Sequence, residues 1–274
     1  MLIRAGYEIS LFCEQETPLL ALLSVHPSRS QDLRTADMIR ASNNHPLTTT
    51  LDEFGNWRTR TIAPAGLLTL TNDFVISDSG KHDFIDTSAK QIAVGELPDA
   101  ALQFLKASRY CESDKLSELA WSLFGTTPPG HARVQAICDY AHNRLKFNYQ
   151  DASQDRTAFG ANEERIGVCR DFAHLGIALC RAMNIPARYC TGYMGDIGVP
   201  LVPPMDFSAW IEVYLDHRWF TFDPRNNIPR IGRVVMAHGR DAADVAITTT
   251  YGPSKLVGFK VHTDPVETLH VKAA

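Results

Sequence analysis

The sequence predicts an α+β protein in which helices pack on an antiparallel sheet, preceded by an antiparallel β domain. Residues 1–95 alternate short strand-like runs with clusters of turn residues, whereas apolar residues recur at helical spacing from about residue 99 onward. Strand-like alternation returns in residues 207–223. We therefore expect two domains, a β domain over residues 1–95 and a mixed core over residues 96–274.

The first segment contains short strand-like runs at residues 6–12 and 72–76. Turn-forming residues separate such runs, at 27–28, 43–46 and 78–80. Sheets built from strands this short cannot bury their apolar faces unaided. We therefore expect an antiparallel β domain that packs against the core.

Two segments ahead of residue 150 show the apolar spacing of buried helix faces, and we assign them no chemistry. The first follows Asp114 and ends before Gly125. The apolar positions are Leu116, Leu119, Ala120 and Leu123 in the first segment, and Val134, Ile137, Cys138, Ala141 and Leu145 in the second.

A third helix is predicted to begin at Cys169 and to end where Pro186 follows. Its buried face comprises Phe172, Leu175, Gly176, Leu179, Cys180 and Met183. Cys169 lies in the first turn, where unpaired N–H groups and the helix dipole favour a thiolate, so we expect its pKa to be lowered. Cys180 and Cys190 lack this position, and we interpret both as structural.

Residues 207–215 and 218–223 have the pattern of two strands joined by a turn, either at Asp216 and His217 or in a neighbouring register with a loop of even length. Ser208, Trp210 and Glu212 share one face of the first strand. A turn of even length pairs even positions with odd ones, which places Ser208 and Asp223 on the same face. On that face Asp223 would orient a base at position 208 opposite Cys169, the arrangement of thiol proteases.

Charge and hydropathy exclude several functional classes. The 274 residues carry a formal net charge of -4, and their lysines and arginines are dispersed, which argues against a nucleic-acid partner. The first residues reach a charge too early for a signal peptide, and no stretch has the length of a membrane span. We expect no membrane partner and a cytoplasmic location of bacterial type.

Ligand spacing gives no support for a metal or a cofactor. The six cysteines are scattered, without C-x-x-C pairs, and H-E-x-x-H is absent, so we predict reduced thiols and no metal. Neither G-x-G-x-x-G nor G-x-x-x-x-G-K-[ST] occurs, so we predict no nucleotide cofactor.

The residues around Cys169 resemble the transglutaminase-like superfamily of bacterial proteins, many of which are described as cysteine proteases. Residues 52–57, Asp-Glu-Phe-Gly-Asn-Trp, resemble an element of the β domain that precedes the core in many members. The stretches that carry the likeness in the core are 167–189, 208–214, 219–224 and 239–245. The resemblance implies a papain-like core behind an N-terminal β domain, with Cys169 as nucleophile and Asp223 as the orienting acid.

The chain departs from this family at Ser208, which stands where the family has its histidine base. A serine hydroxyl cannot accept a thiol proton near neutral pH as an imidazole does. A histidine elsewhere could replace it, and His238 is the first candidate because the family places the stretch after it near the groove; a surface loop position is the alternative. His174 fits a hydrogen-bonded packing role and His217 a solvated turn. The remaining possibility for catalysis is a thiol that works without an imidazole, with Ser208 holding a water or a substrate group.

We predict a thiol-dependent hydrolase or acyl transferase that acts on an amide or peptide bond through a thioester on Cys169. The alternative is a catalytically impaired relative whose groove binds a peptide or protein partner without cutting it. The candidate catalytic residues are Cys169, Ser208 and Asp223, and the candidate groove residues are Trp210 and His238. Each also has a structural interpretation: a buried residue at a helix start for Cys169, a strand-end carboxylate bonded to backbone for Asp223, and packing for Trp210.

Overall fold

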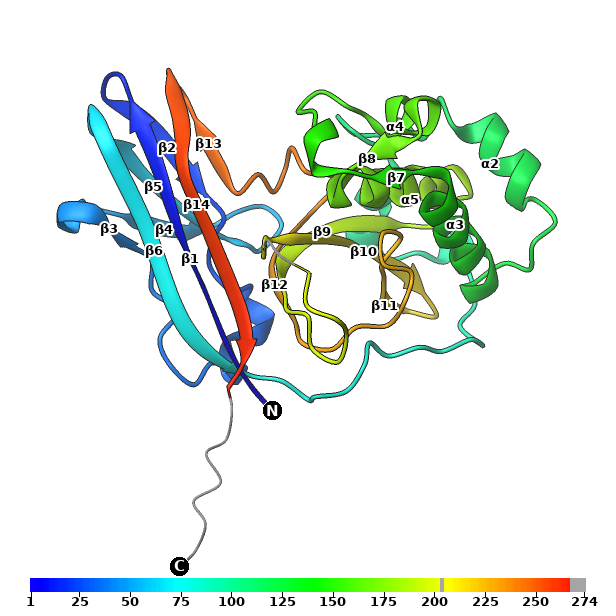
Figure 1. The fold of residues 1–274 in the computed structure, drawn as a ribbon. Coiled ribbons are helices and arrows are strands. Elements are labelled where there is room, and N and C mark those ends of the chain that lie inside the picture. The colour runs from blue at the N-terminus through cyan, green and yellow to red at the C-terminus, as the bar shows by residue number, and fades with distance from the viewer. Residues whose placement is uncertain (203–204, 267–274) are drawn as a thin grey trace, which may run out of the picture.

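The computed structural model describes residues 1–202 and 205–266. These residues contain three antiparallel four-stranded sheets and a short parallel pair of strands. Two of the larger sheets lie face to face at one end of the molecule, and the third carries the helices (Figure 1). This arrangement confirms the predicted α+β class. Among the helices of these residues, none combines the length and the apolar composition of a membrane span.

A β sandwich forms the first part of the molecule. Its sheets have the strand orders β14-β1-β6-β3 and β13-β2-β5-β4. The strands are β1 (Leu2–Cys13), β2 (Thr17–Ala21), β3 (Arg40–Ala41), β4 (Thr48–Leu51), β5 (Trp57–Ala63), β6 (Gly66–Ser77), β13 (Thr248–Thr250) and β14 (Ser254–Pro265). In β1, every odd-numbered residue from Ile3 to Cys13 is buried, the period of a strand with one face in a core. The residues buried from both sheets form one apolar cluster.

The strands nearest the C-terminus complete this sandwich. Strand β14 pairs with β1, and β13 pairs with β2, so the red and orange end of the chain lies beside the blue beginning (Figure 1). The sequence grouped residues 248–265 with the core. In the structure, these residues belong instead to the sandwich. Strand β1 pairs with β6 on one side, and its other edge needs a second partner, which no local sequence pattern identifies.

The remaining sheet and the helices form the core. The sheet has the order β11-β10-β9-β12. Its strands are β9 (Ala187–Met194), β10 (Ser208–Leu215), β11 (Arg218–Phe222) and β12 (Arg233–Gly239), and the short parallel pair is β7 (Lys146–Phe147) and β8 (Ile166–Gly167). The helices are α1 (Asp99–Leu102), α2 (Ser117–Phe124), α3 (His131–Arg144), α4 (Ala158–Glu164) and α5 (Cys169–Ala182).

Helix α5 is the centre of the core and is buried from Asp171 to Ala182. One side packs on β9 and β10, and the other packs on α2, α3 and α4. Gly176 lets the helix approach the sheet, because a Cβ there would lie 2.8 Å from Cγ of Pro224. The predicted helix boundaries and buried face are confirmed, and the helix packs on β10, the strand that begins with Ser208.

The β10–β11 hairpin has the predicted two-residue turn. Asp216 and His217 adopt φ values of 45° and 61°, the left-handed pair of a type I′ turn. Glu212 lies opposite Thr221, so even positions of β10 pair with odd positions of β11. The predicted register is confirmed, and His217 occupies the turn.

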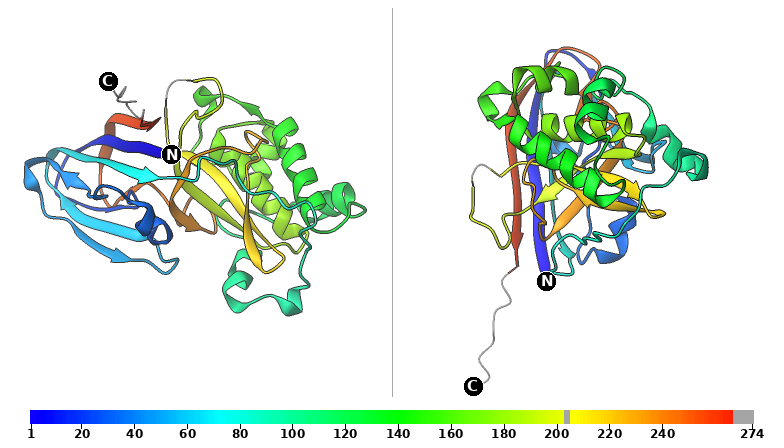
Figure 2. Two further views of the ribbon diagram at one scale, coloured as in Figure 1. Left: turned by 90° about the horizontal axis from the view of Figure 1, so that it is seen from below. Right: turned by 90° about the vertical axis from the view of Figure 1, so that its right-hand side faces the viewer.

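The sandwich packs on the face of the core sheet that α5 leaves free, and Figure 2 shows the helices on the far side of that sheet. The Asn56 amide accepts from the His238 N–H at 2.8 Å and donates to the His238 carbonyl at 2.9 Å. Tyr193 and Phe207 of the core join the apolar cluster of the sandwich. The expected packing of the β region on the core is confirmed.

Candidate active site

Cys169 occupies the first residue of α5, which is where the sequence placed it. The Asp171 carboxylate accepts a hydrogen bond from the Val168 N–H at 2.9 Å and so fixes the start of the helix. All six cysteines have free thiols, and the five others are buried while Cys169 is partly exposed. It is therefore the thiol that a substrate can reach.

A pocket of about 320 Å³ adjoins this thiol. Tyr149, Asp206, Ser208 and Arg225 are among the residues that line it. The charges of Asp206 and Arg225 affect the pKa of the Cys169 thiol and also that of Tyr149. We refer to these four side chains as one electrostatic group. The pocket lining thus contributes an anion and a cation whose charges reach the Cys169 thiol.

The expectation of a lowered thiol pKa is wrong. Burial raises the pKa of Cys169, and the nearby Asp206 charge raises it further. Arg225 and the backbone N–H groups of Ala209 and Arg170 lower it, but they do not compensate for the loss of solvent. The start of the helix supplies the expected N–H donors, but the effect of desolvation on the thiol pKa is larger than theirs.

Sequence patterns did not identify Asp206 and Arg225 as residues of the site. Asp206 precedes β10, and its backbone neighbour Phe207 donates to its carboxylate at 2.6 Å. Burial raises the pKa of Asp206, while the Phe207 hydrogen bond and Arg225 lower it less. The sequence offered one indication, the short separation along the chain: Asp206 lies two residues before Ser208, and Arg225 lies two residues after Asp223. Both lie in loops, whose conformation no periodic sequence pattern predicts.

Ser208 begins β10 and is nearly buried, opposite Gly192 of β9. It lines the pocket beside Cys169. Because side chains alternate along a strand, Ser208 belongs to the face of Trp210 and Glu212, as predicted. Among the described residues no histidine forms a hydrogen bond to the Cys169 thiol, so the position of the family base remains without an imidazole.

Asp223 follows β11 and is held in a network of its own. One carboxylate oxygen accepts from the N–H groups of Arg225 and Asn226, at 3.1 and 2.9 Å. The other accepts from the Asn226 side chain and from the Arg233 guanidinium, both at 2.8 Å. Burial by itself would raise the pKa of Asp223, but the Arg233 charge and the Asn226 hydrogen bonds hold it below its usual range. These contacts are those of a strand-end carboxylate that anchors a turn.

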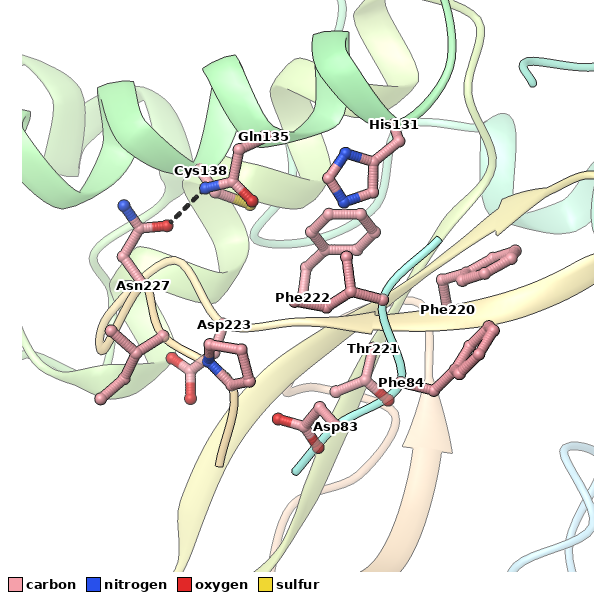
Figure 3. Close-up of a pocket in the computed structure, with 13 residues that line it drawn as sticks. Asp83, Phe84, His131, Gln135, Cys138, Phe220, Thr221, Phe222, Asp223 and Asn227 are labelled. Carbon is pink, nitrogen blue, oxygen red and sulfur yellow. Dashed lines mark hydrogen bonds between the residues drawn. The ribbon is translucent and has the colours of Figure 1, made fainter. Parts of the chain in front are cut away.

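Asp223 also borders a smaller cavity of about 50 Å³, shown in Figure 3. His131 lies over the Phe222 ring there, and Gln135 donates to Asn227 at 2.9 Å (Figure 3). Its one cysteine, Cys138, is buried, and burial raises the pKa of that thiol well above its usual value. We therefore place the candidate active site at the pocket of Ser208 rather than here.

The structure does not bring Trp210 and His238 to the Ser208 pocket. Both line another pocket of about 340 Å³, between the core sheet and the sandwich. Trp210 is buried, with the Arg233 guanidinium 5.1 Å from its ring centre. His238 lies in β12 rather than in a surface loop, and its Nδ1 is 3.3 Å from the sulfur of Cys190.

His174 has the packing role that the sequence favoured. Its ring is fully buried in α5 and stacks on Tyr110 with ring centres 5.1 Å apart. Its Nε2 accepts a hydrogen bond from the Ala242 N–H at 3.1 Å. Burial lowers its pKa well below the usual histidine value, so the ring is neutral. It links α5 to the segment after β12.

Comparison with known sequences gives a family match for part of the chain. The family model described as "Transglutaminase-like superfamily" matches residues 118–224, which include Cys169, Ser208 and Asp223. "Uncharacterized protein ML0607" of Mycobacterium leprae is 25% identical over 193 residues, 67% of each chain. "Uncharacterized protein Rv2569c" of Mycobacterium tuberculosis is 30% identical over 157 residues, 51% of this chain and 50% of the relative. The match thus spans about half the length of the second relative.

A solved structure extends the likeness to nearly the whole chain. The "Putative Cysteine Protease from Cytophaga hutchinsonii" superposes with a TM-score of 0.84 and 28% identity, covering 98% of this chain and 91% of the other. The sandwich, the core sheet and the central helix therefore occur together in both proteins. Residues 118–224 thus match the transglutaminase-like superfamily, within a fold that nearly the whole chain shares with the Cytophaga hutchinsonii protein.

Proposed function

We propose that the protein is a cysteine hydrolase or acyl transferase that attacks an amide or peptide bond and passes through a thioester on Cys169. The observation that carries this proposal is the partly exposed thiol at the start of α5, beside a pocket that also holds Asp206 and Arg225. The name of the Cytophaga hutchinsonii relative supports the same chemistry. The substrate class is a peptide or protein, and the location is cytoplasmic.

Asp206 takes the role of base in this proposal. As the Cys169 sulfur attacks the carbonyl carbon, its proton passes to the Asp206 carboxylate and the carbonyl electrons move onto oxygen. When the intermediate collapses, the C–N bond breaks and Asp206 returns the proton to the leaving amine. Burial raises the pKa of Asp206, which makes the carboxylate a stronger base than a solvated one.

Three other groups complete the proposed site. The N–H groups of Ala209 and Arg170, which lie near the sulfur, are donors for the developing oxyanion. Arg225 contributes positive charge, and Asp223 holds the Arg225 backbone in place. Ser208 holds a water or a substrate group in the pocket. Water then cleaves the thioester to an acid, or an amine converts it to a new amide.

The thioester is tested with an activated ester, because nitrophenolate leaves without a proton. Mixing the wild type with a p-nitrophenyl ester should release a burst of about one nitrophenolate per chain and leave an acyl adduct on Cys169. Mass spectrometry of the digested protein locates the adduct, and added primary amine distinguishes acyl transfer from hydrolysis. Cys169→Ala should abolish the burst, whereas Cys13→Ala, in the sandwich, should retain it. A folded wild type without a burst would favour a binding protein.

The pH dependence of Cys169 alkylation tests the electrostatic group. Burial and Asp206 raise the thiol pKa, so the midpoint for iodoacetamide labelling should lie above the ordinary thiol value of about 8.5. Asp206→Asn removes a negative charge that disfavours the thiolate and should move the midpoint to lower pH. Arg225→Met removes a positive charge and should move it to higher pH.

The matched control for these shifts is Asp196→Asn. Asp196 lines the same pocket but pairs with Arg230 at 2.9 Å. Its loss should leave the labelling midpoint of Cys169 nearly unchanged. Equal shifts from Asp196→Asn and Asp206→Asn would mean that the pocket responds only to net charge, and the assignment of Asp206 as the base would be withdrawn.

A further inference from the structure

Three strands of the core sheet bring a cysteine, a glutamate and a histidine together on the face that meets the sandwich. Cys190 of β9 lies opposite His238 of β12 in the strand register, and Glu212 comes from β10. Nδ1 of His238 is 3.3 Å from the Cys190 sulfur and 3.6 Å from Oε2 of Glu212. The three donor atoms all lie within 4.8 Å of one another.

We propose that Cys190, Glu212 and His238 form a binding site for a zinc-class transition-metal ion, separate from the Cys169 pocket. In tetrahedral zinc sites, Zn–S is about 2.3 Å and Zn–N about 2.0–2.1 Å, which sets neighbouring ligand atoms roughly 3.5 Å apart. The observed separations of 3.3 and 3.6 Å match this spacing without rearrangement of the strands. Thiolate, imidazole and carboxylate together suit zinc better than calcium or magnesium, which prefer oxygen ligands.

A further nitrogen adjoins this cluster. His26, from the sandwich side, has its ring centre 4.6 Å from that of His238. Its Nδ1 is engaged with Ser28, but its Nε2 is buried and has no hydrogen-bond partner within residues 1–202 and 205–266. Buried ring nitrogens are rarely left without a partner. We assign His26 as an additional donor for the ion or for a ligand that completes its coordination.

The charges around the cluster are compatible with a divalent ion. Oε2 of Glu212, the oxygen 3.6 Å from His238, is also held by Arg188 of β9, with Nε at 2.7 Å and Nη2 at 2.5 Å. When Oε2 binds the ion, Oε1 is the oxygen that can accept from Arg188. Arg233 of β12 is neutralised by Asp83 and Asp223. Two anionic ligands, Cys190 and Glu212, balance a divalent cation.

An access route leads to the cluster from solvent. Glu212 and His238 line the pocket of about 340 Å³ between the core sheet and the sandwich. Residues from 28–29 and 78–83 form its other wall. An ion can therefore enter where the two parts of the molecule meet, and its binding should stabilise their contact.

The test uses full-length protein carrying Cys169→Ala, which removes the exposed thiol. Titration with Co²⁺, a spectroscopic substitute for zinc, should give one bound ion per chain and a thiolate-to-cobalt charge-transfer band, and added Zn²⁺ should displace it. Cys190→Ser should eliminate the band, and His238→Gln should weaken binding by at least about 10-fold to 100-fold. Cys138→Ser, which alters an equally buried cysteine in α3, should leave the charge-transfer band and the affinity for the ion unchanged.

Thermal unfolding separates loss of ligands from loss of fold. Zn²⁺ should raise the melting temperature of the Cys169→Ala protein but not that of the Cys190→Ser variant in the same background. Absence of the band in the folded parent protein, or a band that persists after Cys190→Ser, would overturn the proposal. The cluster would then be a hydrogen-bonded packing element between the sheet and the sandwich.

Discussion

Ser208→His should raise the rate of amide hydrolysis by about 10²–10⁴-fold, the usual contribution of general-base assistance. The new imidazole would stand at the first residue of β10, at the edge of the pocket beside Cys169. Ion pairing with the imidazolium should also lower the pKa of the Cys169 thiol, which burial raises in the wild type. The wild type should be slow on simple peptide amides, because a carboxylate is a weaker base than an imidazole.

The network around Asp223 limits this gain. An orienting hydrogen bond to the new imidazole would have to share a carboxylate that already accepts from Arg225, Asn226 and Arg233. The pocket of about 320 Å³ offers space for the ring. Ser208→Ala is the matched control, since it removes the hydroxyl without adding a base and should give no gain.

Three measurements decide the outcome: hydrolysis of a fluorogenic peptide amide, its pH profile, and the alkylation midpoint of Cys169. Cys169→Ala added to Ser208→His should abolish the gained activity. Wild-type activity already at ordinary protease rates would show that another residue serves as an efficient base. A folded Ser208→His protein with unchanged thiol reactivity would show that position 208 no longer has catalytic geometry.

Arg233→Met should destabilise the protein by about 3–5 kcal/mol, the effect of removing one partner from a buried ion pair. Arg233 bridges two carboxylates, Asp83 at 2.9 Å and Asp223 at 2.8 Å, and its side chain is 8% exposed. Its loss would leave both carboxylates without their guanidinium in a poorly solvated place. Urea unfolding at neutral pH measures the change.

The pH dependence of this effect has a definite sign. In the wild type the pKa of Asp223 is lowered, so its contribution to stability is complete above the unfolded value of about 3.9 and disappears as the pH falls through the folded pKa. Without Arg233, burial would raise the pKa of Asp223. Protonation of Asp223 would then remove the cost of burying an unpaired carboxylate in the variant. The stability difference should therefore begin to narrow above about pH 4, where the variant takes up a proton, and should narrow further as the pH falls through the lowered pKa of the wild type.

Arg4→Met is the matched control for the ion pair. Arg4 pairs with Asp73 at 2.5 Å, but both side chains are exposed, at 60% and 48%. Exposed pairs contribute at most about 1 kcal/mol. Equal destabilisation by the two substitutions would mean that burial of the Arg233 network does not determine its importance.

Local patterns in the sequence determined the elements that carry the candidate site. Alternation in β1, the apolar face of α5 and the two-residue turn at Asp216 and His217 each depend on neighbours a few positions away, and the structure has all three as predicted. The position of Cys169 at the start of α5 and the register that joins Glu212 to Thr221 follow from the same short-range rules.

Only the tertiary structure decided how distant residues combine. The pairing of β14 with β1 joins the two ends of the chain, and the ion pairs of Arg233 join residues from three segments. The cluster of Cys190, Glu212 and His238 has no ligand spacing in the sequence, because each residue comes from a different strand.

The raised pKa of the Cys169 thiol has the same origin. Helix position is a local property, and it predicted the N–H donors near the sulfur. Desolvation and the charges of Asp206 and Arg225 depend on which loops close over the helix start, and they are set by packing across the whole fold. Sequence therefore determined the place of Cys169 at the start of α5, while long-range contacts set the direction in which the pKa of its thiol is shifted.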